Sequence, residues 1–151
     1  RLPSQPVDVP VMNLRVMRVS IALWWGSLTT LFGVVPMLFI HLPTPALAGG
    51  MAARLFSAQT YVSLACGLVL LLGLWLAGKE ASENTATRSE RRVCAVLVTL
   101  ALLAVVGVEW GAAPHIVARD NLKFWHALGT SLFSAQWLCC AALLWRLSGQ
   151  R

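Results

Sequence analysis

The chain has 151 residues, of which 58% are hydrophobic and 12% are charged, and its mean hydropathy is +0.70. Soluble globular domains carry about twice this share of charged residues, so the composition excludes that class and indicates one membrane-embedded domain. The formal net charge of +6 does not indicate a nucleic-acid-binding protein, because the basic residues flank apolar segments and form no extended patch with interleaved aromatic residues.

The first segment, residues 1–18, contains Pro3, Pro6 and Pro10 and then becomes basic. Proline inside a helix removes a hydrogen bond and clashes with the preceding turn, so we expect a non-helical start with a helix beginning no earlier than Met12. The first residue is not Met, and we therefore expect the chain to derive from a processed or longer one. The segment is predicted to be a cytoplasmic N-terminal tail.

Four apolar segments follow, each long enough to cross the hydrocarbon core of a bilayer, which needs about 20 helical residues. They cover residues 19–40, 59–77, 93–113 and 124–145. The sequence therefore predicts an all-α polytopic membrane protein, in which an antiparallel bundle of four transmembrane helices forms one domain over residues 19–145.

Small and polar residues give two of these spans a distinct face. On the first span, Gly26, Thr30 and Gly33 are spaced by four and three residues, which permits close contact with another helix. On the fourth span, small and polar residues form a flank that should face other helices rather than lipid. The flank comprises Gly129, Thr130, Ser134 and Gln136.

The segments between the spans differ in character. Residues 46–58 are helix-prone and are expected to continue into the second span, whereas residues 78–92 are polar, lack apolar periodicity and are predicted to be an exposed loop. Pro36 is expected to kink the last turn of the first span.

The basic residues are divided unevenly between the two ends of the predicted bundle. Nine fall at the end that holds both termini and the 78–92 segment, and three fall at the other. Because positively charged residues favour the cytoplasmic side, both termini, including the tail at residues 146–151, are predicted to be cytoplasmic. The three basic residues on the outer side are Arg54, Arg119 and Lys123.

This topology would bring all three histidines to the outer face, since His41 closes the first span, His115 follows the third and His126 opens the fourth. Imidazole is a common ligand of copper, zinc and haem iron, so the three could share one metal ion, or His41 and His126 could bind a haem. Alternatively, each ring caps a helix or anchors it at the membrane interface. His126 is the best single candidate, because its helical position is expected to point it toward neighbouring helices.

Glu109 is the only carboxylate inside a predicted span. An acid about one turn inside the membrane is costly unless it is paired or protonated. Three interpretations are open: an ion pair with Arg54 or Arg119, a site that handles a proton or cation, or a fourth ligand to a metal held by the histidines.

The remaining reactive groups point to no catalytic chemistry. The four cysteines form no CxxC motif and are expected to be buried and inert. The sequence contains no P-loop, GxSxG, HExxH or dinucleotide-binding glycine motif. No catalytic residue is predicted, and the protein is not expected to be an enzyme.

Three runs, WGSLTTLFGVVPMLFIHLP, ARLFSAQTYVSLACG and FWHALGTSLFSAQWL, resemble the transmembrane protein 205-like family of four-helix membrane proteins. The matching features are a basic-Leu-Phe start to the second span at Arg54 and an aromatic residue and histidine, Phe124 and His126, that open the last span. The likeness covers most of residues 19–145, although the family has an Asn near the position of Ser134.

The resemblance implies a polytopic membrane protein, and the eukaryotic member is associated with tolerance of platinum drugs. A more distant resemblance to copper-resistance D-like membrane proteins favours a metal at the outer histidines. Neither resemblance implies a catalytic residue.

The first functional hypothesis is therefore a bacterial inner-membrane protein that handles copper, zinc or haem at the outer histidines. The alternatives are a non-catalytic accessory subunit of a larger membrane complex and an oligomeric channel or transporter. The expected partners are the lipid bilayer and either further copies of the chain or a larger membrane complex.

Overall fold

The computed structural model describes residues 10–80 and 85–149, and these ranges are helical except for the short connections at residues 42–44 and 118–121 and contain no strand. The elements are α1 (Pro10–His41), α2 (Pro45–Glu80), α3 (Thr85–Val106), the π-helical segment η1 (Gly107–Ala112), α4 (Ala113–Val117) and α5 (Leu122–Gly149).

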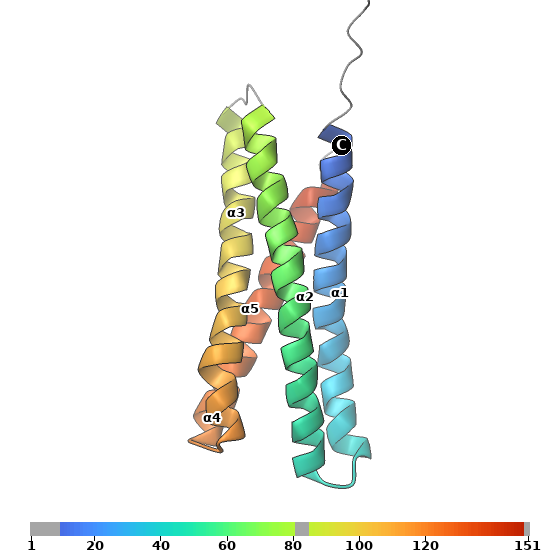
Figure 1. The fold of residues 1–151 in the computed structure, drawn as a ribbon, viewed down its shortest axis with the longest axis vertical. Coiled ribbons are helices and arrows are strands. Elements are labelled where there is room, and N and C mark those ends of the chain that lie inside the picture. The colour runs from blue at the N-terminus through green and yellow to red at the C-terminus, as the bar shows by residue number, and fades with distance from the viewer. Residues whose placement is uncertain (1–9, 81–84, 150–151) are drawn as a thin grey trace, which may run out of the picture.

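The helices form an antiparallel bundle (Figure 1). Helix α1 packs against α2 and α5, and α3 packs against the same two helices. Helix α5 crosses the bundle obliquely, from α4 at one end to the start of α1 at the other (Figure 1). We call the end where α1 begins and α5 finishes the terminal end, and the end formed by the α1–α2 turn and α4 the histidine end.

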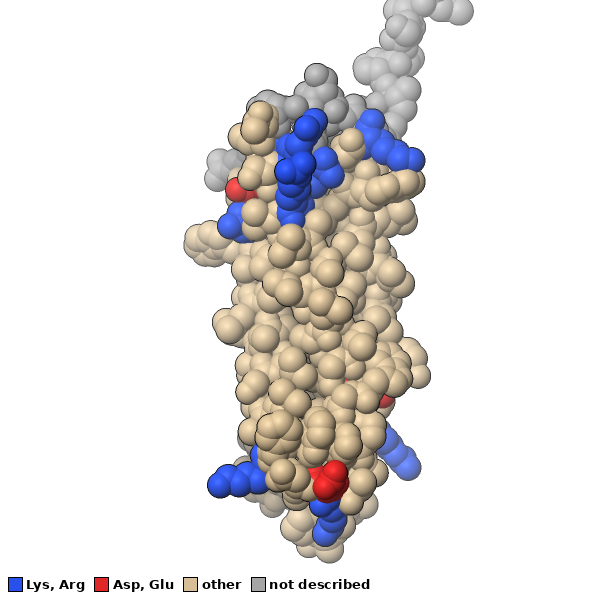
Figure 2. Space-filling model, turned by 90° about the vertical axis from the view of Figure 1, so that its left-hand side faces the viewer, with Lys and Arg blue, Asp and Glu red and all other residues tan. Residues whose placement is uncertain are grey.

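Four helical stretches are long and apolar enough to cross a membrane, and the prediction of an all-α, four-helix membrane protein is confirmed. They are Leu14–His41, Pro45–Lys79, Thr85–Val117 and Leu122–Gly149. Charged side chains gather at the two ends of the molecule, and the broad band between them carries almost none on the face shown in Figure 2. This distribution matches an integral membrane protein whose uncharged middle lies in the hydrocarbon core.

The helices extend beyond the predicted spans at both ends. Helix α1 begins at Pro10, because proline is well suited to the first position of a helix, where its missing N–H would have no partner in any case. The helix thus starts two residues before Met12, the earliest start that the sequence predicted, and residues 1–9 lie outside the described part. The same helix continues through Pro36 to its end at His41.

The prediction of an exposed loop over residues 78–92 is wrong for most of that segment. Helix α2 continues to Glu80 and α3 starts at Thr85, and only residues 81–84 lie outside the described ranges. Lys, Glu, Ala and Arg are good helix formers, so the polar residues extend the two helices past the apolar band. This polar stretch therefore forms the end of α2 and the start of α3, although it lacks apolar periodicity.

The continuous helix predicted from residues 46–58 into the second span is confirmed by α2, and its start has a clear local cause. The Thr44 hydroxyl accepts a hydrogen bond from the N–H of Leu47 at 3.3 Å, and the Thr44 carbonyl accepts one from Ala48 at 3.1 Å. A threonine cap followed by proline at the first helical position is a strong helix-start signal.

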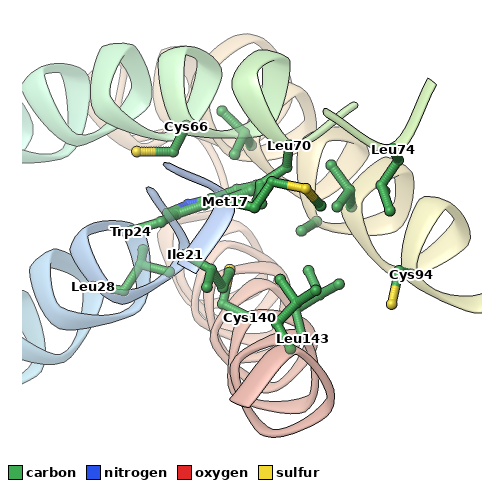
Figure 3. Packing of buried hydrophobic residues seen from close by; sticks show 14 of the residues in the cluster. Met17, Ile21, Trp24, Leu28, Cys66, Leu70, Leu74, Cys94, Cys140 and Leu143 are labelled. Atoms are coloured by element: carbon green, nitrogen blue, oxygen red, sulfur yellow. The ribbon is translucent and has the colours of Figure 1, made fainter. Parts of the chain in front are cut away.

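The apolar core lies between the four long helices and is concentrated toward the terminal end (Figure 3). Its fully buried members come from all four long helices: Ile21, Trp24 and Leu28 from α1, Leu70 from α2, Val98 and Ala101 from α3, and Cys140 and Leu143 from α5. Tryptophan is enriched at membrane interfaces, but the side chain of Trp24 is 0% exposed. It fills the centre of this core instead.

The close helix contacts occur at other glycines than those predicted. A Cβ at Gly67 would lie 2.5 Å from the Leu102 side chain, and one at Gly73 would lie 2.7 Å from the Met17 sulfur. A Cβ at Gly26 or Gly33 would meet nothing within 4 Å. The predicted small-residue face of α1 therefore makes no close contact among the described residues, because that side of α1 is turned away from α2 and α5.

Candidate functional site

Glu109 lies in η1, where the turn widens between α3 and α4. The N–H of Ala113 donates to the carbonyl of Val108, five residues earlier, instead of to the residue four earlier as in an α-helix. Single π-helical turns inside α-helices frequently mark functional positions. Here the turn carries the one acidic residue of the segment toward α2.

The carboxylate of Glu109 is held by two hydroxyl groups of α2. The hydroxyl of Ser57 donates to Oε1 at 3.0 Å, and that of Thr60 donates to Oε2 at 3.1 Å. The Thr60 oxygen also lies 3.2 Å from the Phe56 carbonyl oxygen, one turn back on the same helix. Glu109 is half-buried, whereas Thr60 is 7% exposed. The acid is thus cradled by neutral groups that can both donate and accept hydrogen bonds.

The predicted ion pair of Glu109 with Arg54 or Arg119 is absent from the described residues. Ion pairs elsewhere in this part of the chain include His115 with Asp120 and Arg146 with Glu90. The side chains of Arg54 and Arg119 are exposed at the histidine end, where long basic side chains reach the headgroup region. Water and lipid headgroups are better partners for these guanidinium groups than an acid inside the bundle.

A second group of polar side chains adjoins Glu109 and its hydroxyl partners and links three helices. Ser63 accepts hydrogen bonds from the Nε2 atoms of Gln59 at 3.2 Å and Gln136 at 2.9 Å. Gln59 also donates to the Ser27 hydroxyl at 2.9 Å, and Ser27 in turn donates to the Trp24 carbonyl at 2.8 Å. Buried polar groups away from water need such partners, so α1, α2 and α5 are tied together at this level.

Between these two sets of residues lies a small cavity of about 10 Å³. That is room for about one water molecule. The polar lining residues are Gln59, Thr60, Ser63 and Gln136, and the apolar ones are Phe56, Val105, Val108 and Phe133. Thr60 belongs both to this lining and to the cradle of Glu109, so the acid and the cavity share one hydroxyl group.

Aromatic rings close the site from the side. Phe56 and Phe133 meet edge to face with their centroids 5.3 Å apart, and Phe32 meets Phe133 in the same way at 5.0 Å. The indole of Trp137 lies next to Phe32 and donates to the Thr29 hydroxyl at 2.9 Å. These contacts join α1, α2 and α5 around the polar residues.

The histidines lie at the histidine end but in separate surroundings. His41 is exposed, and its Nδ1 lies 3.0 Å from the Met37 carbonyl of its own helix. His115 stacks on Trp125 with centroids 3.9 Å apart, and its Nδ1 lies 3.3 Å from Asp120. His126 is exposed. These positions agree better with helix ends and interface anchors than with a shared site.

Over residues 10–80 and 85–149, no group of three or more His, Cys, Asp or Glu side chains is placed to hold a metal ion. His41, His115, His126 and Glu109 are therefore not brought together as one ligand set in this conformation. The four cysteines are unpaired; Cys66, Cys94 and Cys140 are buried.

The predicted polar flank of α5 is divided by the structure. Gln136 is buried at 3% exposure and faces the other helices as predicted, whereas Thr130 is exposed. His126 was expected to point toward neighbouring helices. It lies seven residues before Phe133 and therefore on the same side of α5 as the buried residues Phe133, Gln136 and Cys140. It is exposed nonetheless, because the bundle does not cover the first turn of α5.

The residues of α2 are the part of the site that the sequence interpretation missed. Ser57, Gln59, Thr60 and Ser63 are spaced so that helical geometry places them on adjoining faces. Four polar residues within seven positions at the start of an apolar span were the available signal. Their importance depends on Glu109, which is about 50 residues away in sequence.

The family described as a domain of unknown function, DUF4149, matches this chain over residues 19–123, which is more than half of its length. The matched region contains Glu109 and all four polar residues of α2, and it ends before His126 and Gln136. No curated protein and no solved structure matches the chain.

Proposed function

Because the chain belongs to the DUF4149 family, whose description assigns no activity, we propose its function from the site itself: an integral membrane protein that binds and releases a proton or a small cation at Glu109. The supporting observation is the cradle of Ser57 and Thr60 hydroxyls around the carboxyl group. This is the cation-handling interpretation of Glu109, and it places the protein with channels and transporters rather than with enzymes.

The chemistry of the partners favours exchange over a fixed structural role. An arginine beside Glu109 would hold the carboxylate permanently ionised. A hydroxyl donates to an ionised carboxylate, accepts from a protonated one and offers a lone pair to a cation. Acids in membrane-spanning helices commonly mark proton or ion pathways, and neutral, adaptable partners suit such a role.

The apolar core limits how a single chain could act. Between the polar site and the terminal end lie Trp24, Leu70 and Leu143, all 0% exposed. A proton or cation at Glu109 is thus sealed from the terminal end in this conformation. Passage across the membrane would need a change in helix packing or the participation of further copies, as the predicted oligomeric channel or transporter implies.

The test is ion movement in proteoliposomes with a pH-sensitive dye inside and imposed proton or sodium gradients. We expect Glu109→Gln to abolish the protein-dependent flux, because the amide cannot take up or release a proton and carries no charge. The matched control is Glu90→Gln, which alters an exposed acid paired with Arg146 at 2.6 Å and should leave the flux unchanged. Equal flux in wild type and Glu109→Gln would refute the proposal.

We further propose that both termini are cytoplasmic and that the membrane is a bacterial inner membrane. The support is the excess of basic residues at the terminal end, including Arg15, Arg18, Arg88 and Arg92. A green fluorescent protein fused after residue 151 should fluoresce, whereas alkaline phosphatase fused after Leu42 should be active. The reverse pattern would invert the orientation.

A second candidate function is the accessory subunit of a larger membrane complex. The observation that favours it is the open face of α1, where Gly33 and Met37 border a groove of about 510 Å³. Purification in mild detergent with a reproducible partner would support this function, and a stable isolated chain would count against it.

Metal or haem binding at His41, His115, His126 and Glu109, and the closer relationship to transmembrane protein 205-like and copper-resistance D-like proteins, stay predictions. Exposure of His41 and His126 lends the binding site no support. Elemental analysis and a visible spectrum of the purified protein would decide it.

A further inference from the structure

We infer that the occupant of the Glu109 site is a proton rather than a metal ion, and that the Thr60 hydroxyl switches its hydrogen bond to hold that proton. The inference rests on the proposed function and names its ligand. Three features carry it: the small number of oxygens available at the site, the balance of hydrogen bonds in each protonation state, and the apolar seal toward the terminal end.

The spacing of the oxygens suits hydrogen atoms between them. Ser57 and Thr60 lie 3.0 and 3.1 Å from the two carboxylate oxygens, which are hydrogen-bond separations. Neighbouring oxygen ligands of Mg²⁺ also lie about 3 Å apart, so the number of available oxygens, and not their spacing, distinguishes a proton from a metal ion. The cradle offers four side-chain oxygens and the adjoining cavity has room for about one water, which falls short of the six or more oxygens that Mg²⁺ and Ca²⁺ require.

The hydrogen bonds balance in both protonation states through one rotation. With Glu109 ionised, Ser57 and Thr60 each donate to one carboxylate oxygen. With Oε2 protonated, the new O–H donates to Thr60, and the Thr60 hydroxyl turns to the Phe56 carbonyl, 3.2 Å away. Each hydrogen has an acceptor in both states, so uptake of the proton leaves no unpaired donor.

The proton is exchanged with the histidine end. On uptake, a hydronium ion loses a proton, an O–H bond forms at Oε2 and water is released; on release, a water molecule takes the same proton back. The adjoining cavity, which Thr60 lines together with Gln136, has room for about one water. Toward the terminal end the route is closed by the buried side chains of Trp24 and Leu70.

The experiment uses the full chain in lipid and dicyclohexylcarbodiimide, which reacts with protonated carboxyl groups in apolar surroundings. We expect mass spectrometry to find the label on Glu109, to find less of it as the pH rises, and to find none in Glu109→Gln. Added Na⁺, Li⁺, K⁺ or Mg²⁺ at constant ionic strength should not protect the site.

Infrared spectroscopy reads the two hydroxyl contacts separately. The carbonyl stretch of protonated Glu109 should move to higher frequency in Ser57→Ala, because Oε1 loses its donor. Thr60→Val should shift the same band, since the carboxyl O–H loses its acceptor, and Thr60→Ser should restore the wild-type position. A variant that only loosened the fold would broaden the band without restoration by serine.

The outcomes separate this inference from the proposed function. Protection of Glu109 by one of the cations would overturn the assignment of a proton and leave cation handling intact. Absence of label at every pH, or a band that Thr60→Val does not move, would also overturn the inference. Labelling as expected together with equal flux in wild type and Glu109→Gln would keep the proton site and remove the transport function.

Discussion

Replacement of Trp24 with alanine is expected to lower the free energy of unfolding by about 3 kcal/mol. The indole is 0% exposed and fills the middle of the core between α1, α2 and α5. Lipid solvates an indole better than water does, so the loss comes mainly from missing packing contacts and the cavity left behind. This places the expected value at the lower end of the range known for large-to-small changes.

The control is Trp145→Ala, since Trp145 is 85% exposed and its loss should change stability by less than about 0.5 kcal/mol. Trp24→Phe should fall between the two, because the Nε1–H of Trp24 has no hydrogen-bond partner among the described residues and nothing polar is lost with it. Reversible unfolding in mixed micelles measures all three. Equal stabilities of the two alanine variants would show that this core is packed differently.

Ser63→Ala is the second change with a large expected effect. Ser63 is 0% exposed and its oxygen accepts from both Gln59 and Gln136, so alanine leaves two amide N–H groups without this acceptor. Each such group costs about 1–3 kcal/mol in a soluble protein. Interhelical hydrogen bonds in membranes are measured nearer the lower end, so we expect a total loss of about 2 kcal/mol.

Ser131→Ala is the matched control, because the Ser131 hydroxyl is exposed and, within residues 10–80 and 85–149, bonds only to the Ala127 carbonyl of its own helix at 2.8 Å. Its stability should equal that of the wild type within about 0.5 kcal/mol. The same unfolding assay distinguishes the two serine variants. If Ser63→Ala proved as stable as Ser131→Ala, the link between α2 and α5 would not contribute to the fold.

The two large effects fall in different halves of the bundle. Trp24 belongs to the dry core toward the terminal end, whereas Ser63 belongs to the polar layer beside Glu109. A stable apolar half can hold the helices together while the polar half accommodates Glu109 and its hydroxyl partners. This division explains how a small membrane protein tolerates an acid and a row of amides and hydroxyls in its interior.

The candidate site was only partly predictable. Glu109 stood out because a carboxylate in an apolar span is rare and costly. The histidines stood out because imidazole is a common metal ligand. Their placement at the same end of a bundle does not bring them into one site, and the ring of His115 stacks on Trp125 instead. The partners of Glu109 on α2 are ordinary serine and threonine residues, which carry no signal by themselves.

The sequence alone determined the number of membrane-spanning helices and their antiparallel order, because length and hydropathy suffice when every backbone polar group in lipid must be satisfied within a helix. It also determined that Glu109 lies inside a span. Only the tertiary structure decided that Ser57 and Thr60, 52 and 49 residues from Glu109, are its partners. Their meeting depends on the rotation of α2 against the π-helical turn, and that rotation is set by side-chain packing among all four helices.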